Sequence, residues 1–203
     1  MKRTAQFLVV FSLSGWLGGC GSSEVPRLLS LAEQSRDQHV QATLQFAHAL
    51  EDYAQASQRR AQEISALVSS SDSEELTEPQ RGRLAELMAQ DAAATDSLEV
   101  ASFSLLDATL DTMALASVAY DVCRLSGIQP EILVVLDSLH NHYGDGRDVR
   151  AQYQQAVTRY QRQVEGLDVS SDCTAFKPVQ SSLEEVIRKG ALLLGNPTPQ
   201  QSV

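Results

Sequence analysis

One stretch without helix-breaking residues restricts the fold of this chain more than any other feature. After Pro26, no proline or glycine occurs before Ser69. Two series of residues spaced seven apart run through this stretch, and Phe46, Tyr53 and Leu67 widen them: Glu33, Val40, Ala47, Ala54, Ala61 and Val68, and Leu29, Arg36, Thr43, Leu50, Ser57 and Ile64. A seven-residue repeat favours left-handed packing of one helix on another. We therefore expect a single helix of ~60 Å, at ~1.5 Å per residue, packed closely on a neighbour.

A second helix of similar length is expected after the serine-rich turn at 69–73. Thr77 can cap its start, Pro79 suits its first turn, and Gln80 completes a capping box. The helix extends to about Leu125. Its predicted seam is Leu84, Leu87, Asp91, Ala94, Leu98, Ala101, Leu105, Ala108, Thr112, Leu115, Ala119 and Val122. Because the two helices match in length, we expect them to form an antiparallel hairpin.

Three shorter helices are expected in the rest of the chain. The first spans Ile132 to His142, and the second follows the turn at 144–146 and carries an apolar face from Val149 to Leu167. A loop over 166–174 then precedes a last helix from about Pro178 to Leu194. No alternating apolar and polar run is long enough to predict a strand. The predicted fold is all-α: an elongated helical bundle with a long antiparallel helical hairpin plus shorter C-terminal helices. The first two short helices together form one layer, broken at the glycine-rich turn.

The N-terminus has the layout of a secretory signal. Lys2 and Arg3 precede an apolar run from Phe7 to Leu17, and the run is too short to be a permanent membrane span. Leu17-Gly18-Gly19-Cys20 then resembles the lipobox of bacterial lipoproteins. The resemblance implies that Cys20 carries diacylglycerol and becomes the first residue after cleavage. Several acyl chains anchor stably, because each buried methylene contributes ~0.8 kcal/mol. The alternative is an ordinary secreted protein in which this cysteine occurs by chance.

The same resemblance divides the chain and places it in the cell. Residues 1–19 are expected to be the signal peptide, 20–25 a lipidated linker, 26–195 the helical bundle domain and 196–203 a flexible tail. Gly21 follows the cysteine, where Asp in Gram-negative bacteria resembles an inner-membrane retention signal. We therefore expect a lipid anchor in the outer membrane, facing the periplasm. Residues 21–24 reach at most ~15 Å at ~3.5 Å per residue, so the domain lies close to the membrane.

The charge of the chain excludes one class of partner. The 26 acidic residues outnumber the 16 basic residues, for a net charge of −10. Removal of residues 1–19 takes away Lys2 and Arg3 and no acidic residue, which leaves a net charge of −12. Nucleic-acid binding requires a basic face, so no nucleic-acid partner is expected. An acidic domain is compatible with a protein partner, including a basic one.

Cys123 and Cys173 are an even pair that remains after lipidation. In an oxidising compartment such a pair predicts a structural disulfide. A redox or metal role would need a Cys-x-x-Cys spacing or further ligands nearby, and the sequence contains neither.

No pattern of catalytic or metal-binding residues emerges. His140 and His142 are two apart and His39 and His48 nine apart, so neither pair shares a helix face well. The segment 141–148 lacks the alternating ligands of an EF-hand. Asp91, Asp107 and Asp111 are not accompanied by the Glu-x-x-His pairs of di-metal bundles. Nucleophile elbows and phosphate-binding loops are likewise missing from the sequence. We therefore predict no enzyme activity, no metal and no cofactor.

A short motif gives a second functional hypothesis. Leu76-Thr77-Glu78-Pro79-Gln80, with Leu84, Leu87 and Met88, resembles the Leu-Thr-x-x-Gln signature of small helical periplasmic stress chaperones. A capping box alone would also explain it. The first hypothesis is a lipoprotein that acts as a protein-interaction or structural module, such as an envelope assembly factor or an immunity-type binder. The alternative is a periplasmic chaperone or stress sensor. A concave apolar face on the hairpin would favour the alternative, and a closed bundle would favour the first.

Overall fold

The computed structural model contains five helices, and the all-α prediction is confirmed. It describes residues 25–69, 76–125, 129–144 and 146–195, so Cys20, the predicted signal peptide and the predicted tail lie outside the described residues. No strand occurs in the described ranges. The helices are α1 Arg27–Ser69, α2 Glu78–Cys123, α3 Gln129–Tyr143, α4 Val149–Val164 and α5 Val169–Gly195. None of these helices has a stretch apolar and long enough to cross a membrane.

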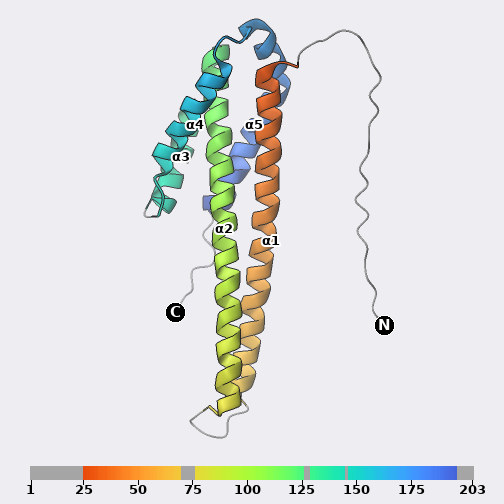
Figure 1. Cartoon of the computed structure of the whole chain (residues 1–203), viewed down its shortest axis with the longest axis vertical. Coiled ribbons are helices and arrows are strands. Elements are labelled where there is room, and N and C mark those ends of the chain that lie inside the picture. Colours follow the sequence, from red (N-terminus) through yellow and green to blue (C-terminus); the bar gives the residue numbers. More distant parts are fainter. Residues whose placement is uncertain (1–24, 70–75, 126–128, 145, 196–203) are drawn as a thin grey trace, which may run out of the picture.

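The long hairpin has α2 as its central helix. The 43 residues of α1 and the 46 residues of α2 lie antiparallel and side by side (Figure 1). At the start of α2, the side-chain oxygen of Gln80 accepts hydrogen bonds from the backbone N–H of Thr77, at 2.8 Å, and from its hydroxyl, at 2.9 Å. The Leu-Thr-x-x-Gln motif therefore acts here as a helix cap. α2 packs on each of the other four helices, whereas α1 packs chiefly on α2 and α5.

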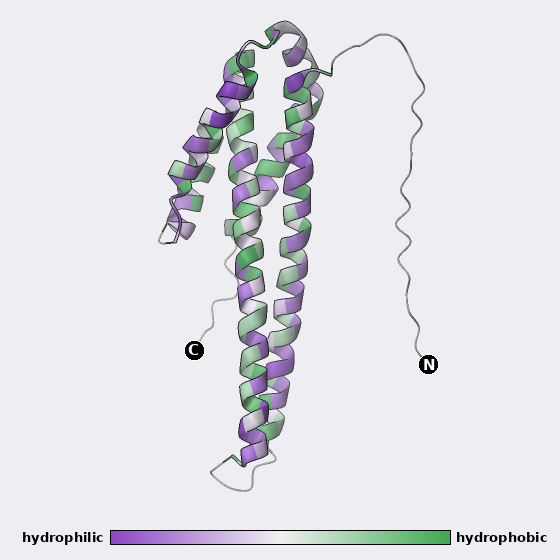
Figure 2. Ribbon diagram, in the orientation of Figure 1, coloured by the Kyte–Doolittle hydropathy of each residue, from purple (hydrophilic) through white to green (hydrophobic). Residues whose placement is uncertain are grey.

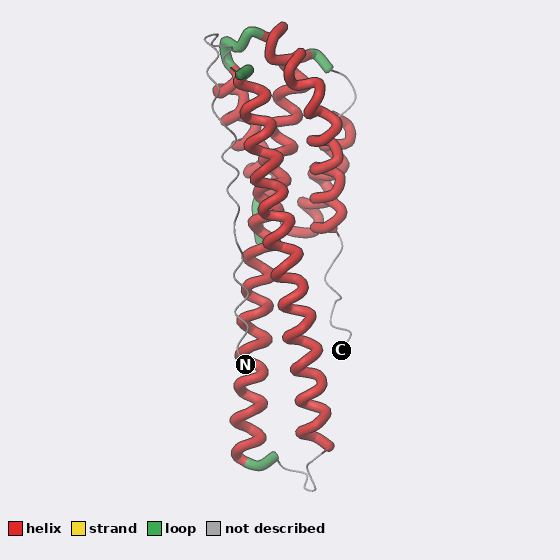
Figure 3. The backbone as a smooth tube through the Cα atoms, turned by 90° about the vertical axis from the view of Figure 1, so that its right-hand side faces the viewer, coloured by secondary structure: helices red, strands yellow, loops and turns green. Residues whose placement is uncertain are grey.

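The shorter helices cover one half of the hairpin. We call the half where five helices meet the head, and the remainder, residues 50–69 and 76–97, the arm. Figure 3 shows the two helices of the arm continuing past the ends of the other three. The core cluster extends from Leu28 to Ala49 on α1 and from Leu98 to Tyr120 on α2, and includes the buried faces of α3, α4 and α5. In the described arm, Leu87 alone is fully buried.

The predicted single layer of the third and fourth helices is wrong, because α3 and α4 reverse direction and form a short hairpin beside α2 (Figure 1). Gly144 closes α3: its N–H donates to the carbonyl of His140 at 2.8 Å. A Cβ at that position would lie 2.4 Å from the same oxygen, so glycine is required. Asp148 then caps α4 by accepting from the N–H of Ala151 at 3.0 Å. α3 therefore ends and α4 begins within five residues, and these two helices cover only the head.

The predicted seam of the first helix is displaced by one residue. In one predicted series the residues Glu33, Val40, Ala47, Ala54 and Ala61 are exposed, and the series containing Leu50 and Ile64 is half-buried. The observed seam alternates steps of four and three residues: Leu28, Ala32, Ser35, His39, Ala42, Phe46 and Ala49, continued by the half-buried Tyr53, Ala56 and Arg60. The seam predicted for the second helix is confirmed, since each of its members is buried or half-buried.

The last helix begins nine residues before its predicted start. Residues 169–177 are helical, so Cys173 lies in α5 and not in a loop, and Pro178 lies inside the helix. Asp168 accepts hydrogen bonds from the N–H of Ser170 at 3.2 Å and from its hydroxyl at 2.9 Å. The first of these bonds satisfies a backbone N–H that a helix start leaves free. Phe176 is fully buried against the core, which holds this first part of α5 in place despite the proline.

A polar layer lies inside the head between α1, α2 and α5. Ser35 and Thr112 have their hydroxyl oxygens 2.9 Å apart, and Nε2 of His39 lies 3.2 Å from Oγ1 of Thr109. Thr109 donates its own proton to the carbonyl of Leu105, so Nε2 of His39 is the donor in its bond to Thr109. Because these groups are buried, each bond favours the observed register of α1 against α2.

Candidate functional site: a glutamine-lined groove

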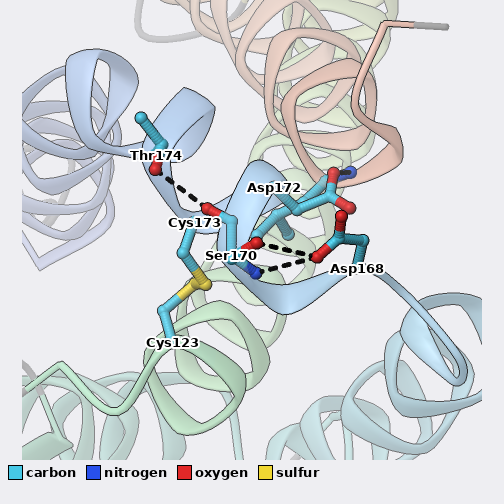
Figure 4. The surroundings of a disulfide bond; sticks show 7 residues. Cys123, Asp168, Ser170, Asp172, Cys173 and Thr174 are labelled. Atoms are coloured by element: carbon cyan, nitrogen blue, oxygen red, sulfur yellow. Dashed lines mark hydrogen bonds between the residues drawn. A yellow bond between two sulfur atoms is a disulfide. The ribbon is translucent and has the colours of Figure 1, made fainter.

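The predicted disulfide pair lies at the end of the head that holds the start of α1. Cys123 at the end of α2 and Cys173 in α5 form a disulfide with Cα atoms 5.5 Å apart (Figure 4). Beside it, the carboxylate of the buried Asp172 accepts from the N–H of Leu28 at 3.1 Å. That bond satisfies one of the free donors at the start of α1. The cysteines and Asp172 thus tie the ends of three helices together, which is a structural arrangement.

The three aspartates singled out on α2 each pair with an arginine of another segment. Asp91 pairs with Arg60 in the arm, and Asp107 accepts from Arg147 at 2.9 Å. Asp111 accepts from Arg159 and from the hydroxyl of Tyr160. These pairs join helices and do not converge on one point. Within the described ranges, no three His, Cys, Asp or Glu side chains are placed to hold a metal ion.

The histidines also lie apart. His39 is 2% exposed in the core, His48 and His142 are exposed, and His140 is half-buried at the end of α3. Burial lowers the pKa of His39 to about 4, so its imidazole is neutral near pH 7. No pair of these side chains forms a shared site in the structure.

A groove lies between α1 and α4, with α2 as its floor. It exists because α4 packs on α2 without packing along α1. Its volume is about 990 Å³. The small side chains of Ala42, Ala108 and Ala156 contribute to its lining and keep it open.

Glutamine side chains line both walls of this groove. Gln34, Gln38, Gln41 and Gln45 are contributed by α1, and Gln152 and Gln155 by α4. The spacing of four, three and four residues puts the α1 glutamines on one helix face. None of the six makes a side-chain hydrogen bond within the part of the chain that the structure describes. Oε1 of Gln152 is buried and accepts no hydrogen bond there.

The charged side chains of the groove neutralise one another. Arg147 and Arg159 extend from the side of α4 to Asp107 and Asp111 on α2, and Arg36 pairs with Asp37 on α1 at 3.2 Å. The guanidinium of Arg147 also lies 4.2 Å from the centre of the Phe103 ring. Burial, and then the bond to the Asp111 carboxylate, raise the pKa of Tyr160, so its hydroxyl keeps its proton. The groove therefore presents uncharged amides between paired charges.

Sequence reasoning missed this groove, although part of the signal was present. The run of glutamines at 34, 38, 41 and 45 is visible in the sequence as a face of one helix. The sequence does not show that α4 leaves this face uncovered, because the predicted arrangement places the third and fourth helices in a single layer.

Compared with protein-family models, curated proteins and solved structures, the chain matches none.

Proposed function

We propose that this protein is a lipid-anchored lipoprotein of the outer membrane that faces the periplasm and binds a protein partner. The observation that carries the proposal is the arm: about half of the long hairpin has no third helix packed on it. A hairpin that served only to build a core would gain nothing from extending beyond its covering helices, since helices are stabilised mainly by tertiary packing. An uncovered pair of helices is a surface suited to a partner.

The polarity of the arm supports reversible protein binding and not general chaperone activity. Figure 2 shows hydrophilic residues recurring along the whole length of both long helices. On the described arm, Met88 is the sole large hydrophobic side chain that is strongly exposed, at 62%. A chaperone of unfolded proteins would need a broad apolar face. We therefore favour a specific interaction module, such as an assembly factor or an immunity-type binder, over the chaperone alternative.

The position of the first helix supports a defined orientation at the membrane. α1 begins at Arg27 at the head end of the hairpin (Figure 1), seven residues after Cys20. With a lipid on Cys20, the head would lie next to the membrane and the arm would extend away from it. The tip of α1 would reach ~65 Å from its start, at ~1.5 Å per residue.

Metabolic labelling tests the anchor. A palmitate analogue should label the wild-type protein and leave Cys20→Ala unlabelled, and only the wild type should sediment with membranes. Label on both proteins, or on neither, would contradict the lipid anchor.

Photocrosslinking in cells tests partner binding. A photoreactive amino acid at the exposed arm positions Gln62 and Ala93 should give a discrete adduct of one size with the lipidated protein. In the Cys20→Ala variant, the same photoreactive positions should give no adduct, because the protein is no longer held at the membrane. A wild-type protein without a discrete adduct at any surface position would refute the interaction role.

A further inference from the structure

We infer that the glutamine-lined groove between α1 and α4 binds a short, extended and uncharged polypeptide segment of the partner. The inference rests on the proposed function and assigns it a binding site. It depends on four observations: the cavity, the unused amides along it, the neutralised charges and the shape of its lining.

The amides give the groove its chemistry. Each of the six glutamine side chains offers both a donor and an acceptor, and none of them is used by the described chain. A polypeptide backbone offers one N–H and one C=O at every residue, so it matches a row of carboxamides in both roles.

The paired charges disfavour an ionic ligand. Both arginines of the groove are paired with aspartates, Arg147 with Asp107 and Arg159 with Asp111, which largely neutralises their attraction for an anion. Asp37 is paired with Arg36, which leaves the α1 wall without a free carboxylate for a cation. Recognition is therefore by neutral hydrogen bonds, and its strength should respond little to salt.

The lining also disfavours a carbohydrate. No aromatic side chain is among the residues that line the groove, so a sugar ring would find no flat face to stack on. Its length suits a peptide: the α1 glutamines span ~16 Å at ~1.5 Å per residue, which corresponds to about five residues of an extended chain at ~3.3 Å each.

A photoreactive amino acid at Ser104 reports on occupancy, because Ser104 is exposed and lines the groove without being one of the glutamines. In the full lipidated protein it should give an adduct that mass spectrometry maps to one short partner segment without charged side chains. The double variant Gln38→Ala/Gln41→Ala should lower the adduct yield about tenfold, the equivalent of losing two neutral hydrogen bonds. The control is Gln161→Ala, an exposed glutamine of α4 that lies outside the arm and does not line the groove, and it should leave the yield unchanged.

A synthetic peptide of the mapped segment completes the test. Its Kd for the purified protein should change less than about twofold between 50 and 500 mM salt. Three results would overturn the inference. They are a Kd that depends strongly on salt, a mapped segment that carries charged side chains, and an adduct that is removed by muramidase and not by protease, which would be a carbohydrate. Adducts at the arm positions without one at Ser104 would refute peptide binding in the groove and leave the proposed function intact. The absence of any adduct would refute both the groove binding and the proposed function.

Discussion

At the scale of single residues, Gly190 lies in tight contact with the polar layer of the head. A Cβ on Gly190 would lie 2.4 Å from Nε2 of His39 and 2.8 Å from Oγ1 of Thr109. Gly190→Ala should therefore lower the free energy of unfolding by ~1–3 kcal/mol, because the packed layer must shift. The matched control is Gly82→Ala on α2, where a Cβ meets nothing within 4 Å. That change should stabilise the protein by ~0.5–1 kcal/mol, and urea unfolding of both variants checks the opposite signs. Equal effects would contradict the packing argument.

His39 should make the stability depend on pH. Its pKa is lowered to about 4 by burial, below the value of about 6.5 expected in the unfolded chain. The unfolded state therefore binds a proton first as the pH falls. Stability should be complete above pH ~6.5 and decline towards pH ~4, by a total on the order of 3 kcal/mol. His39→Gln should flatten this part of the unfolding profile, measured in urea at several pH values. A wild-type slope that persists in the variant would assign it to other groups.

At the scale of helices, the sequence predicted the number, type and approximate length of the elements but not all of their faces or limits. On α1 the predicted stripe lies one residue from the observed seam, because alanines occur on both sides of the helix. Val40 and Ala47 made an exposed series look apolar, while Ser35 and His39 hid the true seam among polar residue types. Their burial depends on Thr112 and Thr109 of α2, and a pattern within one helix does not contain that information.

The start of α5 was missed for a related reason. Pro178 and the polar residues before it are typical of a loop. The capping bonds of Asp168, the bond from Leu28 to Asp172 and the burial of Phe176 together stabilise helix there. These are contacts across the fold, and tertiary packing outweighs local propensity in this segment.

The disulfide should stabilise the head without being needed for its secondary structure. It closes a loop across a sequence separation of 50 residues. Cys123→Ala together with Cys173→Ala should lower the free energy of unfolding by ~2–4 kcal/mol and the Tm by several degrees. The far-ultraviolet spectrum should stay helical, because the seams of α1 and α2 do not include the bond. Mass spectrometry of the non-reduced protein gives the direct check, and two free thiols would show that the bond does not form in the cell.

At the scale of the whole molecule, the hairpin was predictable and the division into head and arm was not. The lengths of α1 and α2 follow from stretches with few helix-breaking residues. Coverage of only half the hairpin follows from the reversal at Gly144, which places α3 and α4 side by side. The same reversal opens the groove, so one turn determines both candidate surfaces.

The arm should therefore be separable from the head. Excision of 54–60 from α1 and 88–94 from α2 removes Arg60 together with its partner Asp91. Seven residues are close to two full turns at ~3.6 residues per turn, so both seams are restored across the junctions. The head should keep its Tm to within ~4 °C, the equivalent of about 1 kcal/mol, while the helical signal falls by the share of residues removed.

The control removes 54–58 and 90–94: five residues are ~1.4 turns, so the seam beyond each junction faces away from its partner. This variant should lose the cooperative packing of the arm, seen as faster proteolysis at its tip. A head that melts far below the wild type after the seven-residue excision would mean that the arm and the head fold as one unit.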